Sequence, residues 1–183
     1  MLKYILIPML PFIAFLINGL FGRRYLKDNS HWVSIFTIIA SFILSLFAFA
    51  EVYAGKPITV ELYNWVSYGN FKVDINLYID QLTSIMLLIV TGVSTLVHIY
   101  TVGYLHGDNG YYRFFAYLSL FTFSMLMLVL ADNYVVIFFF WEAVGLCSYL
   151  LIGFWYHKKS ATDAGKKAFS GEKEVKLEQA HNS

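Results

Sequence analysis

Residues 128–155 read LVLADNYVVIFFFWEAVGLCSYLLIGFW, and this stretch decides the fold class. From Val135 to Tyr156 the one formal charge is Glu142. An apolar run of about 18–25 residues spans a hydrocarbon core roughly 30 Å thick, because an α-helix rises about 1.5 Å per residue. The triplet Ala131-Asp132-Asn133 leaves room only for a tight turn, so the helices on either side of it are expected to be antiparallel neighbours.

Four more uncharged runs precede this stretch, and the chain as a whole is 58% hydrophobic and 14% charged. Soluble domains carry about 25% charged residues, and a soluble protein of this size does not need five such runs. We therefore predict an all-α integral membrane protein with a transmembrane helix bundle at residues 1–156. Five helices are expected at about 2–22, 31–54, 80–104, 112–131 and 134–156.

The lysines and arginines indicate the orientation, because cytoplasmic loops are enriched in them. On one side of the bundle lie Arg23, Arg24, Lys27, Arg113, Lys158, Lys159, Lys166 and Lys167. On the other side lie Lys3, Lys56 and Lys72. This asymmetry predicts an outer N-terminus and a cytoplasmic C-terminal tail.

The outer loop between the second and third helices has a pattern of its own. Apolar and polar residues alternate before and after Ser67-Tyr68-Gly69-Asn70. This period of two around a turn predicts a short β-hairpin on the outer surface, with an irregular loop as the alternative. At the other end, residues 157–183 form a polar tail, which is expected to be disordered or weakly helical from Ser170 onward.

Glu142 is the main candidate for chemistry. It lies about eight residues into the fifth helix, roughly 12 Å from its start. A charge in mid-bilayer costs on the order of 2.5–3.5 kcal/mol, so such a residue is usually paired or exchanges a proton. The alternative is a protonated carboxyl that only hydrogen-bonds a neighbouring helix. Gly145 and Tyr149 share its helix face, and the Tyr149 hydroxyl could support a proton relay.

A polar stripe in the third helix adds a second candidate. It consists of Ser84, Thr91, Ser94, Thr95 and His98. Hydroxyl groups in hydrocarbon need hydrogen-bond partners, so this face is expected to point into protein. His98 titrates near neutral pH and could relay protons, or it could close an interhelical hydrogen bond; the sequence leaves both open.

Two aspartates stand at expected helix starts, where an acidic side chain caps the free backbone N–H groups. Asp80 is expected to cap the third helix, and Asp132 could cap the fifth in the same way.

Several classes of site are excluded by composition. Cys147 is the one cysteine, so neither an intramolecular disulfide nor a cysteine-based metal or cluster site can form within the chain. Zinc signatures, phosphate-binding glycine loops and nucleophile–base constellations are missing. Basic patches interleaved with aromatics are missing too, which argues against nucleic-acid binding. We predict no metal site and no cofactor in this chain.

The stretch at 128–155 resembles the fourth-to-fifth helix region of the large antiporter-like subunit family of NADH:quinone oxidoreductase (complex I), called subunit L in bacteria. Three more segments share the resemblance, which covers residues 1 to about 169. They are LPFIAFLINGLFGR at 10–23, VTGVSTLVHIYTVGYL at 90–105 and YRFFAYLSLF at 112–121.

The resemblance implies a role for the Trp141-Glu142 pair. In this family the glutamate of that motif translocates protons and pairs with a lysine on the seventh helix. The resemblance thus implies that the chain is a membrane subunit of an enzyme complex, in the cell inner membrane, that contributes to proton translocation coupled to quinone reduction. Its expected partners are other membrane subunits, the lipid bilayer and the remainder of the subunit with the lysine.

The chain departs from the family after Phe169, where residues 170–183 read SGEKEVKLEQAHNS and cannot span a membrane. We therefore expect an N-terminal fragment, whether natural, frameshifted or cut. Two alternatives for its function stay open. One is a relative, either an Mrp-type cation/proton antiporter or a membrane-bound hydrogenase subunit. The other is a structural or assembly protein without transport.

Overall fold

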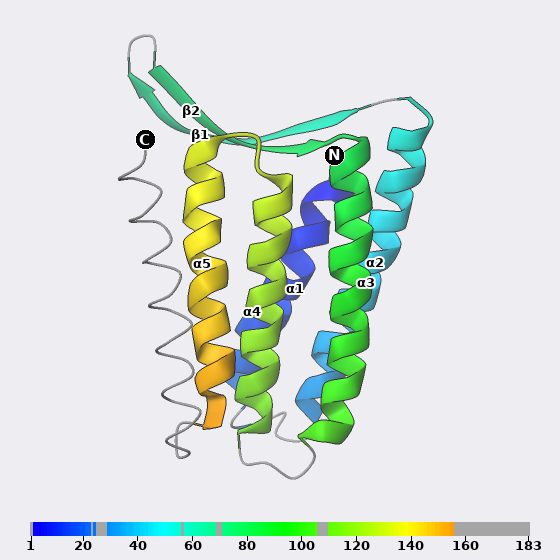
Figure 1. The fold of residues 1–183 in the computed structure, drawn as a ribbon, viewed down its shortest axis with the longest axis vertical. Coiled ribbons are helices and arrows are strands. Elements are labelled where there is room, and N and C mark those ends of the chain that lie inside the picture. Colours follow the sequence, from blue (N-terminus) through cyan, green and yellow to red (C-terminus); the bar gives the residue numbers. More distant parts are fainter. Residues whose placement is uncertain are drawn as a thin grey trace, which may run out of the picture.

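The computed structural model describes residues 2–22, 24, 29–55, 57–68, 71–105 and 110–155. Five long helices and one hairpin make up this part of the chain (Figure 1). The elements in chain order are α1 (Leu2–Phe21), α2 (Ser30–Tyr53), β1 (Ile58–Tyr68), β2 (Phe71–Ile79), α3 (Gln81–Tyr104), α4 (Tyr111–Leu130), α5 (Tyr134–Ile152) and the 3₁₀ turn η3 (Gly153–Trp155).

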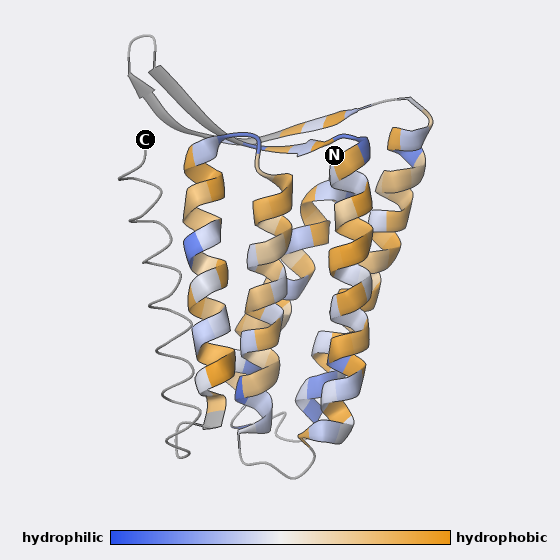
Figure 2. Cartoon of the chain, viewed as in Figure 1, coloured by the Kyte–Doolittle hydropathy of each residue, from blue (hydrophilic) through white to orange (hydrophobic). Residues whose placement is uncertain are grey.

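All five helices are long and apolar enough to cross a membrane. Apolar colour covers most of each helix from end to end in Figure 2. The predicted membrane bundle of five helices is therefore confirmed. The fifth helix ends at Ile152 and continues as η3, where the sequence predicted a helix to 156. The predicted polar tail lies outside the described residues and stays a prediction.

The helices alternate in direction, and α4 has a central place in the bundle. It packs against α1, α3 and α5, while α2 packs against α1 and α3. Among the described elements, α5 packs mainly against α4 and the adjoining η3. In Figure 1, α5 accordingly stands at the edge of the bundle.

The predicted β-hairpin is present, and its apolar side chains belong to the core. β1 and β2 pair antiparallel, with irregular register between Glu61 and Tyr63 and between Asn64 and Val66. The hairpin runs across the ends at which α1, α3 and α5 begin (Figure 1). Its apolar residues Val60, Leu77 and Ile79 are buried in one cluster with side chains of α1, α2, α3 and α4. Burial of these side chains fixes the hairpin on the bundle.

The two predicted caps have different outcomes. Asp80 caps α3, because its Oδ1 accepts a hydrogen bond from the Thr83 N–H at 2.7 Å. This bond lowers the pKa of Asp80, so the cap stabilises the fold at neutral pH and is lost as the pH falls through that lowered pKa. The prediction for Asp132 is wrong. Asn133 caps α5 by accepting from the Val136 N–H at 2.9 Å.

Proline shapes the contact between α1 and α2. Pro11 lies inside α1 and has no N–H, so it leaves the carbonyl of Ile7 without its intrahelical donor. The Ser41 hydroxyl of α2 donates to this carbonyl at 2.7 Å. Ser41 is fully buried, and in hydrocarbon such a carbonyl needs a donor. The serine thus repairs the helix bond that the proline removes.

We expect Ser41→Ala to destabilise the bundle by about 0.6–1.7 kcal/mol, the range for hydrogen bonds between membrane helices. Ser45→Ala is the matched control, because the Ser45 hydroxyl is equally buried but donates within α2, to the Ser41 carbonyl. That carbonyl keeps its backbone donor, so the control should stay near wild type. Unfolding in a titration with sodium dodecyl sulfate measures both variants. Equal losses would contradict this account of Ser41.

Candidate functional site

Glu142 lies near the middle of α5, on a helix that the rest of the described chain hardly covers. Within α5 the buried side chains are Val136 and Cys147. Glu142 itself is exposed, as is its neighbour Trp141. Figure 2 shows α5 as an apolar helix with one strongly hydrophilic position along it. The carboxyl group thus lies on the exposed side of a mostly apolar helix.

The two other residues of the predicted site on α5 are partly covered. Gly145 and Tyr149 follow Glu142 by one and two helical turns, and both are half-buried. Two turns correspond to about 11 Å along the axis. The tyrosine is therefore placed farther along the same helix face.

His98 lies elsewhere in the bundle. It is buried in α3, and its Nδ1 is 2.7 Å from the Ser94 carbonyl oxygen. A carbonyl only accepts, so Nδ1 carries the proton of this bond. This bond is within α3, so it is not the interhelical bond considered from the sequence. The His98 ring packs near Phe115 of α4, with centroids 6.1 Å apart.

The structure therefore does not bring His98 and Glu142 together. α4 packs against both α3 and α5, and in Figure 1 it stands between them. The predicted site divides into the exposed Glu142 and the half-buried Tyr149 on α5, and His98 inside the bundle.

The polar stripe of α3 points into protein as predicted, since Ser84, Thr91 and His98 are buried. Other helices contribute buried polar side chains that the sequence analysis did not identify. Asn18 Nδ2 donates to Ser34 Oγ at 2.7 Å, and Ser34 Oγ lies 3.0 Å from Ser119 Oγ.

These three residues connect α1, α2 and α4. The sequence carries one signal that could have revealed them, which is the recurrence of serines at helical spacing in α2. The buried ones are Ser30, Ser34, Ser41 and Ser45. A polar interior thus runs through the bundle away from Glu142.

One ion pair was also missed. Lys3 of α1 pairs with Glu51 of α2, and the Tyr4 hydroxyl donates to the same carboxylate. The pair is partly exposed at the hairpin end of the bundle, where it joins the ends of two helices. Among the described residues, no group of three histidine, cysteine or acidic side chains could hold a metal ion.

Two families match parts of the chain. Residues 65–115 match the family described as NADH-Ubiquinone oxidoreductase (complex I), chain 5 N-terminus. Residues 131–172, which include Glu142, match NADH:quinone oxidoreductase/Mrp antiporter, TM.

Curated relatives agree with both matches. NADH-quinone oxidoreductase subunit L of Rickettsia typhi is 51% identical over 166 residues, which cover 90% of this chain and 25% of the relative. The same subunit of Neisseria meningitidis serogroup A is 44% identical over 172 residues, 92% of this chain and 26% of the relative. The chain is thus similar to complex I subunit L of these bacteria. It spans about a quarter of the length of these subunit L relatives.

Solved structures share the fold of this chain. A chain of the membrane-bound sulfane sulfur reductase, an archaeal respiratory membrane complex, superposes with a TM-score of 0.79 at 19% identity, covering 91% of this chain and 33% of that one. A chain of the Mrp complex from Dietzia sp. DQ12-45-1b gives a TM-score of 0.72 at 26% identity, covering 91% of this chain and 17% of that one. The fold of this chain thus occurs in chains of both complexes.

Proposed function

We propose that this chain forms the N-terminal part of a membrane subunit of NADH:quinone oxidoreductase and contributes to proton translocation coupled to quinone reduction. The observation that carries the proposal is Glu142, a carboxyl group in mid-span on the exposed side of α5. Its segment lies within the antiporter-like match, and relatives that are 44–51% identical are named subunit L.

The proposed chemistry is proton exchange at the Glu142 carboxyl. Apolar surroundings favour the neutral form, and a nearby cation favours the carboxylate. The family resemblance implies a lysine in the remainder of the subunit. A change in the distance between this lysine and the Glu142 carboxyl would make the carboxyl take up or release a proton. The free energy would come from quinone reduction elsewhere in the complex. In this proposal Tyr149 supports the relay along α5, and His98 serves a separate polar region.

The test is proton translocation by the assembled complex. We expect inverted membrane vesicles with the full-length subunit to move more protons per NADH oxidised than vesicles from a strain that lacks it. Electron transfer from NADH to quinone is measured in the same vesicles, as the control that the subunits responsible for electron transfer are intact. Equal proton yields in the two strains would contradict the proposal.

Cation/proton antiport is a second candidate, and the likeness to the Mrp complex supports it. The two candidates differ in their response to sodium. An antiporter exchanges protons for sodium ions across vesicles without NADH, whereas a complex I subunit requires NADH oxidation.

We further propose that the partners are the other membrane subunits of complex I and the remainder of the subunit, and that the chain holds no redox cofactor. Electron transfer then takes place in other subunits, and this one contributes to the proton path.

We propose that the N-terminus and the hairpin face the outside of the inner membrane. In single-cysteine variants lacking Cys147, a membrane-impermeant maleimide should label Ser67→Cys from outside and Ser170→Cys from the cytoplasmic side. The reason is the excess of lysine and arginine in the loops opposite the hairpin. Labelling of Ser67→Cys from the cytoplasmic side alone would reverse the orientation.

A further inference from the structure

The turn between α4 and α5 is joined to the outer hairpin. Leu77 of β2 and Ala131 of the turn form an antiparallel bridge. The next opposed pair in this register is Asn76 and Asp132. Asn76 Nδ2 donates to Asp132 Oδ2 at 2.9 Å, and Asn133 Nδ2 donates to the other carboxylate oxygen at 3.2 Å. Asp132 is thus held from the hairpin and from the residue that caps α5.

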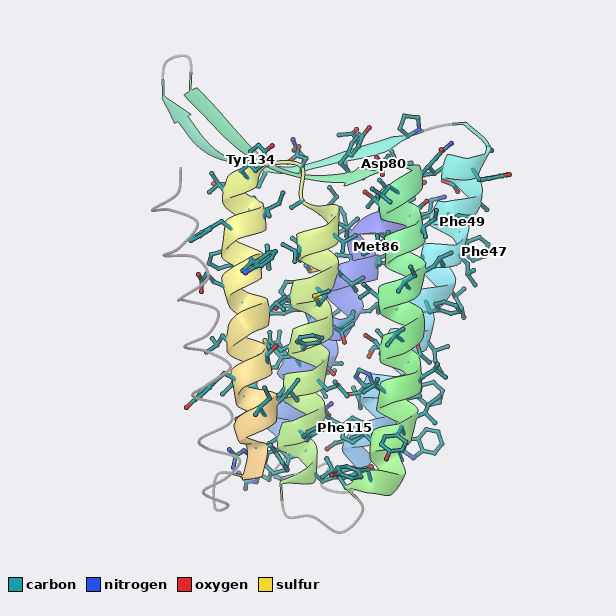
Figure 3. The ribbon with its side chains drawn as sticks, viewed as in Figure 1. Phe47, Phe49, Asp80, Met86, Phe115 and Tyr134 are labelled. Carbon is teal, nitrogen blue, oxygen red and sulfur yellow. The ribbon has the colours of Figure 1, made fainter. Side chains whose placement is uncertain are left out.

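This junction has an apolar support beneath it. Leu77 and Leu130 are buried in one cluster, so the end of α4 and the middle of β2 are fixed relative to each other. In Figure 3, Tyr134 at the start of α5 lies at the same end of the bundle as Asp80, directly below the strands. The outer end of α5 therefore begins at a well-anchored point.

The rest of α5 has little to hold it within the described chain. It packs on α4, with ring contacts between Phe123 and Phe140 and between Phe114 and the Phe154 of η3. A helix is stiff, so a shift or tilt at its start moves every side chain along it. Glu142 follows the cap Asn133 by nine residues, about 14 Å along the axis.

We propose that the contact between Asn76 and Asp132 sets the axial position of α5 and thereby the depth of Glu142, which makes both residues positioning residues for the proton step. The inference rests on the proposed function of Glu142. It assigns the hairpin a role in the chemistry of α5 besides covering the end of the bundle.

The experiment measures the environment of Glu142 directly. A hydrophobic carbodiimide modifies protonated carboxyls in apolar surroundings, and mass spectrometry gives its rate of reaction at Glu142 in the assembled complex with the full-length subunit. We expect Asp132→Ala and Asn76→Ala each to change this rate by about threefold or more, as for the loss of one hydrogen bond. The double variant should change it no further than Asp132→Ala alone, because that variant already removes the bond from Asn76. Asp132→Asn keeps an acceptor oxygen for Asn76 and should restore the wild-type rate.

A reversible disulfide bond distinguishes a loss of helix positioning from misfolding of the protein. Asn76→Cys and Asp132→Cys are combined in an otherwise cysteine-free background, since directly opposed residues of antiparallel strands have Cα atoms within disulfide range. The oxidised protein should label and pump like wild type, and the same sample after reduction should behave like Asp132→Ala. Equal labelling before and after reduction, or wild-type labelling in both alanine variants, would overturn the inference. Normal pumping by Glu142→Gln would instead refute the proposed function, and the labelling rates would still decide whether the contact positions α5.

Discussion

Glu142→Gln in the full-length subunit is expected to abolish or strongly reduce proton translocation while the complex still assembles. Glutamine keeps the shape and the hydrogen-bonding capacity of a protonated glutamate, but it has no titrating proton. A residue that only packs would tolerate this change almost silently. Protons moved per quinone reduced, in membranes with equal amounts of assembled complex, distinguish the two roles.

Asp132→Asn is the matched control for Glu142→Gln, because both changes replace a carboxylate by an amide. Asp132 lies outside the helices, and its contact with Asn76 needs an acceptor oxygen, which asparagine retains. The control should be mild. Normal pumping in Glu142→Gln, or a larger loss in Asp132→Asn, would remove Glu142 from the proton path.

Much of the fold follows from the sequence because the bilayer allows few solutions. An apolar run such as that from Tyr134 to Ile152 must be helical, since hydrocarbon offers its backbone no other hydrogen-bond partners. The hairpin followed from alternation around Ser67–Asn70. In both cases a single periodic signal, read within one segment, was enough.

The identity of the cap on α5 needed tertiary structure. Asp132 and Asn133 are adjacent, and both types of side chain cap helices well. The choice is made by Asn76 on β2, which engages Asp132 and leaves Asn133 for the Val136 N–H. A contact between residues 56 positions apart is invisible to local rules.

For the candidate site, too, the sequence identified single residues, and the tertiary structure was needed to show which of them lie together. Chemistry singled out Glu142 and His98, because ionisable groups in a span are costly. Their separation by α4 depends on how the helices are arranged, and so does the link between Asn18, Ser34 and Ser119. Asn18, Ser34 and Ser119 come from three different helices, and the packing of those helices brings them together.

Phe115→Ala should be the most damaging apolar substitution in the bundle. Phe115 is fully buried in α4, with its ring centroid 4.9 Å from that of Tyr111, 6.1 Å from His98 and 6.4 Å from His31. The rings come from three helices, so the phenyl group joins α2, α3 and α4 at the end opposite the hairpin (Figure 3).

The expected loss of unfolding free energy comes mostly from the cavity that alanine leaves at position 115. The transfer contribution is small, because lipid is as apolar as the bundle interior. At about 24 cal/mol per Å³, the roughly 100 Å³ of a phenyl group corresponds to about 2–3 kcal/mol of unfolding free energy. Phe47→Ala is the matched control, since Phe47 is 58% exposed on α2 and lipid can replace its ring. It should change stability by no more than about 0.5 kcal/mol. Titration with sodium dodecyl sulfate, followed by circular dichroism, measures both variants. A loss in Phe115→Ala no larger than that in Phe47→Ala would mean that the aromatic cluster does not hold these three helices together.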